Sequence, residues 1–565
     1  MHYRLLYGSL LACLIFCCTN CNRKKDITYN QDMGSVMKTE RIEVLIKNLL
    51  AKGQENSGYV TDSLQLSFSH AMAHFYSKSN YKPVWSNDKY WNTIARSLHS
   101  YLDTAVRDGL FKNDYQYKKI DDLFIKLSGD SLSKQDNRYW AEADLLYSNA
   151  FMQIMQDLKQ GRLLKDSLTW KYDPSRYSSF FTVKLNRLIR DQQFNEVLRS
   201  VQPKHPGYIS LKKVIKSFVD SIDTKAYTYL NPYKKGSIPD SVLFIKKLRK
   251  RLHESNMAAV ADLLPDSNAL ARAITGYQVS KNIKPDGKIS LALIRSLNNT
   301  GLEKFKRLAV TLDRFKNLPE MPDKYIWVNL PAYKLEVWEK DEVVLESKVI
   351  CGKSGTPTPL LTSAISDIVI YPTWTVPQSI IVKEILPGLK KNTGYLAKKG
   401  LSLFNNEGEM IDPASVNWSN YSKGIPYKVQ QGSGDGNALG IIKFNFSNPY
   451  AVYLHDTNQR GLFKQSNKAL SHGCVRVQEW EKLAYYILKN DSLRLNRPDT
   501  NRTDIQTFKT WITNKERHTI SVRFPIPLFI RYFGCEAVNG RLKFYDDIYG
   551  ADKLLSERYF TNKRI

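Results

Sequence analysis

The sequence predicts a multidomain α+β protein, in which a helical first half precedes a strand-rich second half. Three observations support this fold class. The chain has 565 residues, which is more than one hydrophobic core usually organises. Apolar residues recur at helical spacing from about 62 to 236, and they alternate with polar residues from Tyr325 onward. The proportions of 42% hydrophobic and 24% charged residues are those of globular domains.

The N-terminal segment, residues 1–21, has the composition of an export signal. Its apolar run, Leu5 to Cys18, lies between basic residues and is too short for a membrane span. Cysteines crowd the end of the run, as in bacterial lipoprotein signals, which makes Cys18 and Cys21 the lipidation candidates. An uncleaved anchor is the alternative. We therefore expect the chain in the cell envelope, on the periplasmic side and anchored to a membrane.

The helical half divides into three predicted segments. Residues 22–61 are polar without a strong period, which indicates a tether. Residues 62–236 form a helical scaffold domain without a catalytic signature, and we expect its tryptophans in the core. Residues 237–300 form a three-helix unit with a turn at 284–287, and Ser290 is placed to cap the last helix.

The strand-rich half begins with two strands joined at Lys340-Asp341, a hairpin pattern. Further strands are predicted at 364–371, 441–446 and 450–455, with a helix around 479–489. We place one domain over 325–505 and expect the strands of 506–565 to complete it. A long insertion at about 378–436 begins as a helix, and insertions of this kind commonly act as lids.

The segment from 453 to 477 concentrates reactive side chains. Cys474 follows Gly473 directly, and His455 lies 19 residues earlier at the end of a predicted strand. A thiol becomes nucleophilic as the thiolate, so a nearby histidine base would activate it. The amides of Gly473 and Cys474 are candidates to face a developing oxyanion, and Tyr453, Ser471 and His472 are candidates to position substrate.

Two simpler interpretations compete with a catalytic cysteine. One is a buried structural cysteine beside a satisfied histidine, which a four-residue motif alone does not exclude. The other is a zinc site, but no second cysteine lies near Cys474. Cys351 and Cys535 are expected to be buried free thiols, and a disulfide between them stays open.

The charge pattern indicates an anionic partner without identifying it. There are 83 Lys and Arg residues against 55 Asp and Glu, a formal net charge of +28. Such a surface favours nucleic acid, acidic lipid or a polyanionic wall, although basic proteins without such partners are common. No nucleic-acid-binding motif is present in the sequence, so we expect no nucleic-acid partner.

The 453–477 segment resembles the active-site signature of the L,D-transpeptidases, which carry a YkuD-type catalytic domain. The matching positions are His455, Ser471, His472, Gly473, Cys474 and Arg476. Further similarity to the large Gram-negative members lies at 329–333, 352–353, 357–359, 374–377, 436–440 and 453–457. The stretch AITGYQVSKNIKPDGKISLALIRSLN resembles the three-helix peptidoglycan-binding domain. The resemblance implies a scaffold, a peptidoglycan-binding-like domain, and a catalytic domain with a capping insertion.

The resemblance also implies a chemistry. Cys474 would be acylated by a peptidoglycan tetrapeptide stem with release of D-Ala, and the acyl group would pass to an amine to form a 3→3 cross-link. Arg476 would hold a carboxylate of the substrate or of the protein. Trp374 and Tyr371 would line the donor groove or pack in the core. Carbapenems would acylate Cys474. Neither a metal nor a cofactor is expected, and the sequence indicates no oligomeric state.

Several alternatives remain open from the sequence. A sortase-like or NlpC-like cysteine hydrolase would also use Cys and His on a strand-rich domain, although its residue spacing fits less well. Water as the acceptor would give an L,D-carboxypeptidase, and a protein lysine would give protein anchoring. The last alternative is a non-catalytic protein that binds the wall, with its glycan and stem peptides as partners.

Overall fold

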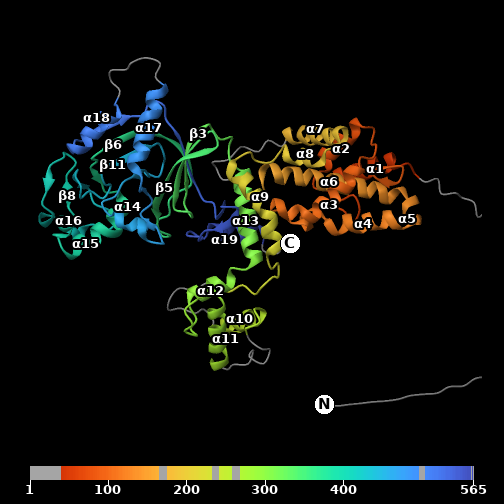
Figure 1. Cartoon of the computed structure of the whole chain (residues 1–565), viewed down its shortest axis with the longest axis horizontal. Coiled ribbons are helices and arrows are strands. Elements are labelled where there is room, and N and C mark those ends of the chain that lie inside the picture. The colour runs from red at the N-terminus through yellow and green to blue at the C-terminus, as the bar shows by residue number, and fades with distance from the viewer. Residues whose placement is uncertain are drawn as a thin grey trace, which may run out of the picture.

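The computed structural model describes residues 40–163, 175–231, 241–257, 267–494, 503–560 and 563. The predicted signal segment, with Cys18 and Cys21, lies outside these residues. Within them, no helix combines the length and apolarity that a bilayer crossing requires. Figure 1 shows a helical region on the right, a strand-rich region on the left, and a small helical unit projecting below the junction.

The helical region is built around α6, whose inward face is buried along most of its length. Trp85 is fully buried and Trp91 is 5% exposed, so both tryptophans pack in the core as predicted. The helices are α1 Ile42–Glu55, α2 Ser69–Lys78, α3 Thr93–Thr104, α4 Tyr117–Gly129, α5 Ser131–Gln135, α6 Asn137–Gln160, α7 Ser175–Asp191, α8 Phe194–Arg199 and α9 Pro206–Ser221. A short hairpin of β1 Ser86–Asn87 and β2 Tyr90–Trp91 precedes α3.

Helix α1 corrects the prediction of a tether over 22–61. Ile46 and Leu50 are buried against α6 and α2, because apolar residues recur here at helical spacing.

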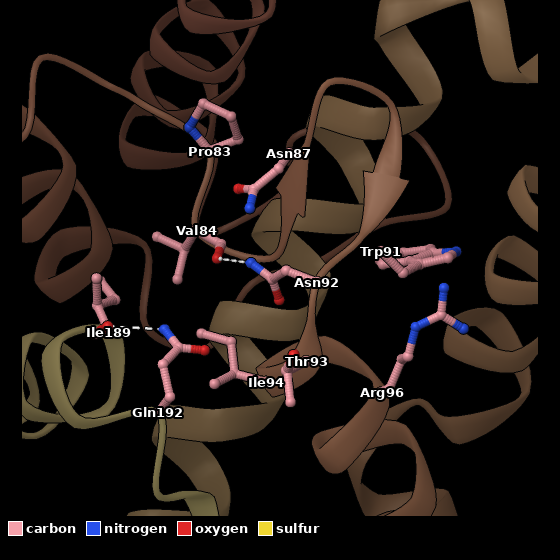
Figure 2. Close-up of a pocket in the computed structure, with 10 residues that line it drawn as sticks. All are labelled: Pro83, Val84, Asn87, Trp91, Asn92, Thr93, Ile94, Arg96, Ile189 and Gln192. Carbon is pink, nitrogen blue, oxygen red and sulfur yellow. Dashed lines mark hydrogen bonds between the residues drawn. The ribbon is translucent and has the colours of Figure 1, made fainter.

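A cavity of about 410 Å³ lies in the helical region, beside the β1–β2 hairpin. Figure 2 shows Asn92 and Gln192 among its lining residues, with the Asn92 side chain donating to the Val84 carbonyl at 2.8 Å.

The projecting unit contains the three predicted helices. Ser290 caps the last of them, since its hydroxyl accepts a hydrogen bond from the Leu293 amide at 3.1 Å. Gly287 has a φ of +63° in the preceding turn, a conformation that favours glycine. The helices are α10 Ser241–Glu254, α11 Ser267–Ser280 and α12 Leu291–Asn298.

Helix α13, Gly301–Lys316, lies at the junction of the three parts (Figure 1) and was not predicted from the sequence. Asp313 on this helix is fully buried between two cations. Its carboxylate lies 3.1 Å from Arg162 Nε, just after α6, and 2.9 Å from Lys316 Nζ. Burial alone would raise the pKa of Asp313, but the two cations outweigh it and the pKa is lowered. This network fixes α13 against the helical region.

We expect Asp313→Ala to destabilise the protein by about 3–5 kcal/mol, because it leaves two cations buried without their counter-charge. Urea unfolding followed by tryptophan fluorescence measures the change. Asp220→Ala is the matched control, since Asp220 pairs with Lys216 on the surface of α9 and should cost little. Equal changes for the two variants would contradict the role assigned to the buried network.

The strand-rich region is one large sheet with the order β11-β12-β14-β5-β4-β3-β16-β6-β15. Because β11 also pairs with β6, the strand path closes on itself. Its strands are β3 Lys324–Asn329, β4 Lys334–Glu339, β5 Glu342–Gly352, β6 Leu361–Ile370, β11 Ile442–Phe446, β12 Leu454–His455, β13 Ala469–Ser471, β14 Val475–Val477, β15 His518–Ser521 and β16 Pro527–Arg531. The predicted hairpin joins β4 to β5, with positive φ at both Lys340 and Asp341.

The C-terminal segment supplies both strands and helices. Strand β16 lies between β3 and β6, parallel to the first and antiparallel to the second. A separate hairpin follows, formed by β17 Cys535–Val538 and β18 Arg541–Phe544. The helices α17 Trp480–Arg494, α18 Ile505–Thr513 and α19 Ala551–Phe560 flank these strands. Cys351 and Cys535 are buried free thiols that belong to different hydrophobic clusters.

The inserted segment at about 378–436, called the cap below, has its own hydrophobic cluster. It begins with helical turns as predicted: α14 Gln378–Ile380, η4 Ile381–Ile385, α15 Leu386–Lys391 and α16 Tyr395–Lys398. Its strands were not predicted from the sequence. These are β8 Leu401–Phe404, β9 Met410–Ile411 and β10 Lys428–Gln431, which pair with β7 Trp374–Thr375 in a small sheet.

Candidate active site

One face of three neighbouring strands gathers the reactive side chains. In the parallel pairing of β12 with β14, Leu454 lies opposite Val475 and His455 opposite Arg476. Cys474, just before β14, is therefore level with Tyr453. Leu454 and Val475 are fully buried in the core, so strand alternation directs the residues on either side of them toward the opposite face. The predicted nucleophile and base thus share one face.

Strand β11 contributes a cation, Lys443, that was not predicted from the sequence. Lys443 pairs with His455 across β11 and β12 and belongs to the same face. Its Nζ lies 4.2 Å from the centre of the Tyr453 ring. The rings of Tyr453 and His455 meet edge to face, with centroids 5.6 Å apart. The alternation in IIKFNF, where Lys443 precedes the buried Phe444, is the signal that would have placed this lysine beside the site.

The surroundings of Cys474 and His455 favour the uncharged form of each side chain. Burial raises the pKa of the Cys474 thiol, although contacts with Tyr453 and the charges of Lys443 and Arg476 act in the opposite direction. Burial lowers the pKa of His455 to about 3, and the charge of Arg476 adds to this effect. These pKa shifts favour a neutral thiol and a neutral imidazole over a resident thiolate–imidazolium pair. The buried Nδ1 of His455 has no hydrogen-bond partner among the described residues.

We expect the rate of Cys474 alkylation by iodoacetamide to rise with pH, with a midpoint above about 8.5, the value for free cysteine. The imidazole is already neutral above pH 3, so no step should appear near pH 6.5. Lys443→Met should move the midpoint further up, because it removes a charge that stabilises the thiolate. Mass spectrometry of the Cys474 peptide measures the rate. A midpoint at or below that of free cysteine would contradict the assigned environment.

Hydrogen bonds fix the turn that carries Cys474. Ser471 Oγ donates to the Cys474 carbonyl at 2.5 Å and accepts from the Gly473 amide at 3.2 Å. Gly473 has a φ of +126°, which side-chain-bearing residues rarely adopt. The Gly473 amide is therefore already engaged in this structure. The Cys474 amide has no acceptor within the described part of the chain, so it is the free donor of the two.

A second set of hydrogen bonds connects the turn that carries Cys474 to the end of β5 and to the C-terminal segment. Thr358 Oγ1 donates to the Gly473 carbonyl at 2.8 Å and accepts from the Gly352 amide at 2.9 Å. Tyr549, from the C-terminal segment, donates its hydroxyl to the Gly352 carbonyl at 2.7 Å and accepts from the Thr358 amide at 3.2 Å. Neither Thr358 nor Tyr549 was predicted as a site residue, because their roles arise only from folding.

His472 is exposed and faces the cap instead of the thiol. Its Nε2 lies 2.6 Å from Glu384 Oε1, on η4 of the cap, and 3.4 Å from Lys353 Nζ. Lys353 and Glu384 are themselves 3.9 Å apart. These three side chains join the cap to the turn that carries Cys474.

The remaining candidates occupy different environments. Arg476 is partly buried, and its Nε and Nη1 have no hydrogen-bond partner in the described structure. Trp374 lies at the edge of the cap and contacts the Tyr453 hydroxyl, beside Cys474. Tyr371 is only 3% exposed, and its hydroxyl donates to Asp435 at 3.3 Å and to the Ile512 carbonyl at 3.4 Å. The structure therefore brings Trp374 to the site and places Tyr371 in the core behind it.

Two family matches cover separate parts of the chain. Residues 323–495 match the L,D-transpeptidase catalytic domain, the YkuD family, and residues 70–215 match the scaffold domain. A Haemophilus influenzae protein, provisionally named an L,D-transpeptidase, is 35% identical over 251 residues. That alignment covers 44% of this chain and 49% of the relative, so the match spans about half the length of the curated relative.

Solved structures with the same family name are more distant. An L,D-transpeptidase from Mycobacterium smegmatis is 12% identical, with a TM-score of 0.17, and covers 37% of this chain and 58% of that chain. One from Stackebrandtia nassauensis is 15% identical, with a TM-score of 0.16, and covers 54% and 97%. At these TM-scores the superpositions carry no argument about the site. The family matches identify the domains: this chain contains a YkuD-family L,D-transpeptidase catalytic domain, preceded by a scaffold domain.

Proposed function

We propose that this protein is an exported L,D-transpeptidase that forms 3→3 cross-links in peptidoglycan, with Cys474 as nucleophile and His455 as base. The observation that carries the proposal is the shared face of β11, β12 and β14. It sets the thiol, the imidazole and two cations together at the edge of the cap. The catalytic-domain match supports the reaction class.

The first step transfers the donor acyl group to sulfur. The neutral His455 imidazole accepts the thiol proton through its free Nδ1, and the sulfur attacks the carbonyl of the third stem residue. A C–S bond forms while the amide bond to the terminal D-Ala breaks. The leaving amine takes the proton from His455. The unengaged amide of Cys474 is the donor available to the developing oxyanion.

The second step releases the acyl group to an acceptor. The side-chain amine of another stem attacks the thioester, so that a C–N bond forms, the C–S bond breaks and a proton returns to sulfur. Water in place of the amine gives carboxypeptidase activity. The cap, which contacts the catalytic turn through Glu384 and His472, is positioned to control which acceptor enters.

Arg476 supports recognition of a substrate carboxylate. Two of its nitrogen atoms, Nε and Nη1, are buried without an acceptor, and leaving such donors unpaired is costly. A stem peptide supplies carboxylates that a guanidinium binds through two hydrogen bonds. Trp374, which contacts Tyr453, belongs beside the donor in the same proposal. We further propose an envelope location on the periplasmic side, with membrane attachment through the lipoprotein-like segment at 1–21.

Incubation of the purified protein with a defined tetrapeptide muropeptide, followed by mass spectrometry, tests the function. The expected product is a 3→3 cross-linked dimer with release of D-Ala. Tripeptide alone would assign the protein as an L,D-carboxypeptidase. Cleavage of a sorting or glycyl peptide, with no reaction on the stem, would favour the sortase-like or NlpC-like alternative. A failure of carbapenem to add mass to the protein would favour a non-catalytic wall-binding role.

A further inference from the structure

Lys443, on β11, is a partly buried ammonium without a counter-ion. It forms no hydrogen bond or ion pair with any described residue, and its contact is the face of the Tyr453 ring. Asp367, on β6, is the carboxylate whose charge reaches it. That carboxylate already accepts hydrogen bonds from Asn445 Nδ2 at 2.5 Å and Ser366 Oγ at 2.8 Å. Burial lowers the pKa of Lys443, as expected of an unpaired cation, so an anionic ligand group would be favoured here.

The ammonium extends toward the thiol. Lys443 Nζ lies 4.2 Å from the centre of the Tyr453 ring. The backbone amide and the hydroxyl of Tyr453 both favour the Cys474 thiolate as hydrogen-bond donors, so this tyrosine stands between the ammonium and the sulfur. Lys443 and Cys474 are both partly exposed on the same face of the sheet. A substrate bound at the sulfur therefore comes within reach of the ammonium.

The second cation of the site, Arg476, occupies a different position. Strand β12 separates β11 from β14, so Lys443 and Arg476 flank His455 from opposite sides. Arg476 Nε and Nη1 are buried, whereas the Lys443 side chain crosses the Tyr453 ring. The two cations can therefore hold two different anionic groups of one ligand.

The donor of the proposed reaction carries a carboxylate close to the attacked atom. The sulfur attacks the carbonyl whose nitrogen belongs to the terminal D-Ala. The D-Ala carboxylate follows that nitrogen by two bonds, so it lies within about 4 Å of the attacked carbon. A stem with one more residue has a neutral amide there and carries its charge about 3.5 Å farther away. A lysine, as a point charge on a flexible chain, can meet the nearer carboxylate.

We propose that Lys443 binds the terminal carboxylate of the donor stem, and that it thereby selects stems with a single residue after the attacked carbonyl. The inference rests on the proposed transpeptidase function, because that function supplies the donor. A stem with a neutral group at this place would cover the ammonium and leave it without a partner, which is costly. Arg476 stays available for another carboxylate of the stem.

Calorimetric titration of the full-length Cys474→Ala protein tests the inference without turnover. The two ligands are a tetrapeptide stem that ends in D-Ala and the same peptide that ends in D-alaninamide. The acid should bind about 10–100-fold more tightly than the amide, the usual effect of a hydrogen bond between charged groups. Adding Lys443→Met should remove this preference while keeping an apolar chain over Tyr453. Adding Lys443→Arg should retain most of it. Lys348→Met, at an exposed position of β5, is the matched control and should retain all of it.

The same two peptides serve as donors for the protein with Cys474 intact. Mass spectrometry measures kcat/KM for release of D-Ala or D-alaninamide. Lys443→Met should slow both donors, because it removes a charge that favours the thiolate, but it should slow the acid by about 10–100-fold more. The ratio of the two donors thus isolates carboxylate recognition, since a general defect of the site lowers both rates equally.

The outcomes separate this inference from the proposed function. Equal affinity for the two peptides, or no binding of either, overturns the inference. So does a preference that survives Lys443→Met, and a preference lost only in Arg476→Met would assign the carboxylate to Arg476 instead. Selective binding that depends on Lys443, with no reaction of either donor at Cys474, would reject the transpeptidase proposal and leave the carboxylate site supported.

Discussion

Replacing Cys474 with alanine abolishes both 3→3 dimer formation and the carbapenem mass shift, because the two other thiols in the described part of the chain cannot take its place. Cys351 and Cys535 are buried, and burial raises their pKa to about 11 and about 12. At neutral pH they remain protonated and inaccessible. The fold should be retained, since Cys474 lies at the edge of the core and not within it.

Intact-mass spectrometry after carbapenem treatment measures the first effect, and muropeptide analysis measures the second. Cys535→Ala is the control, because Cys535 belongs to a different hydrophobic cluster and contacts neither His455 nor the turn from Ser471 to Cys474. It should acquire the full mass shift. An adduct of equal occupancy on the Cys474→Ala protein would place the nucleophile elsewhere and remove the basis of the proposed mechanism.

Replacing His455 with asparagine lowers the rate of Cys474 acylation by about 10²–10⁴, the usual contribution of a general base. The residual rate comes from the oxyanion donor and from substrate binding, which this change leaves in place. The loss should shrink as pH rises, because hydroxide then generates the thiolate that the imidazole no longer provides. Such a pH-dependent recovery would not follow from a purely structural defect.

Stopped-flow acylation by a chromogenic β-lactam between pH 6 and 10 measures this effect. His518→Asn is the matched control, since His518 lies on β15 of the same sheet and stacks on Trp511, with ring centroids 3.8 Å apart. Its acylation rate should equal that of wild type at every pH. A deficit of less than tenfold in His455→Asn at neutral pH would exclude the imidazole as the base.

Local patterns in the sequence predicted the parts of the structure that depend on short-range order. The hairpin at Lys340-Asp341 and the cap at Ser290 follow from turn and helix-end chemistry, which neighbouring residues determine. The alternation around His455 similarly indicated a strand end. The catalytic and scaffold domains were identified through resemblance, and the family matches confirm that identification.

Long-range contacts account for what the sequence did not predict. Lys443 reaches the site only because β11 pairs with β12, and Tyr549 reaches it from the far end of the chain. The segment 22–61 was predicted as a tether because most of its residues are polar, but residues 42–55 form α1, which packs against α6. The strands of the cap are two to four residues long, which is too short for a clear alternation.

The position of β16 has a consequence for how the enzyme matures. This strand separates β3 from β6, yet it is made after every reactive residue of the site has left the ribosome. Until it inserts, the sheet lies open on both sides of the gap, and such late, distant pairing is slow. A newly made chain thus carries its thiol in an unfinished scaffold, and a stop codon before Pro527 should give an inactive, protease-sensitive product even though the whole reactive motif is present.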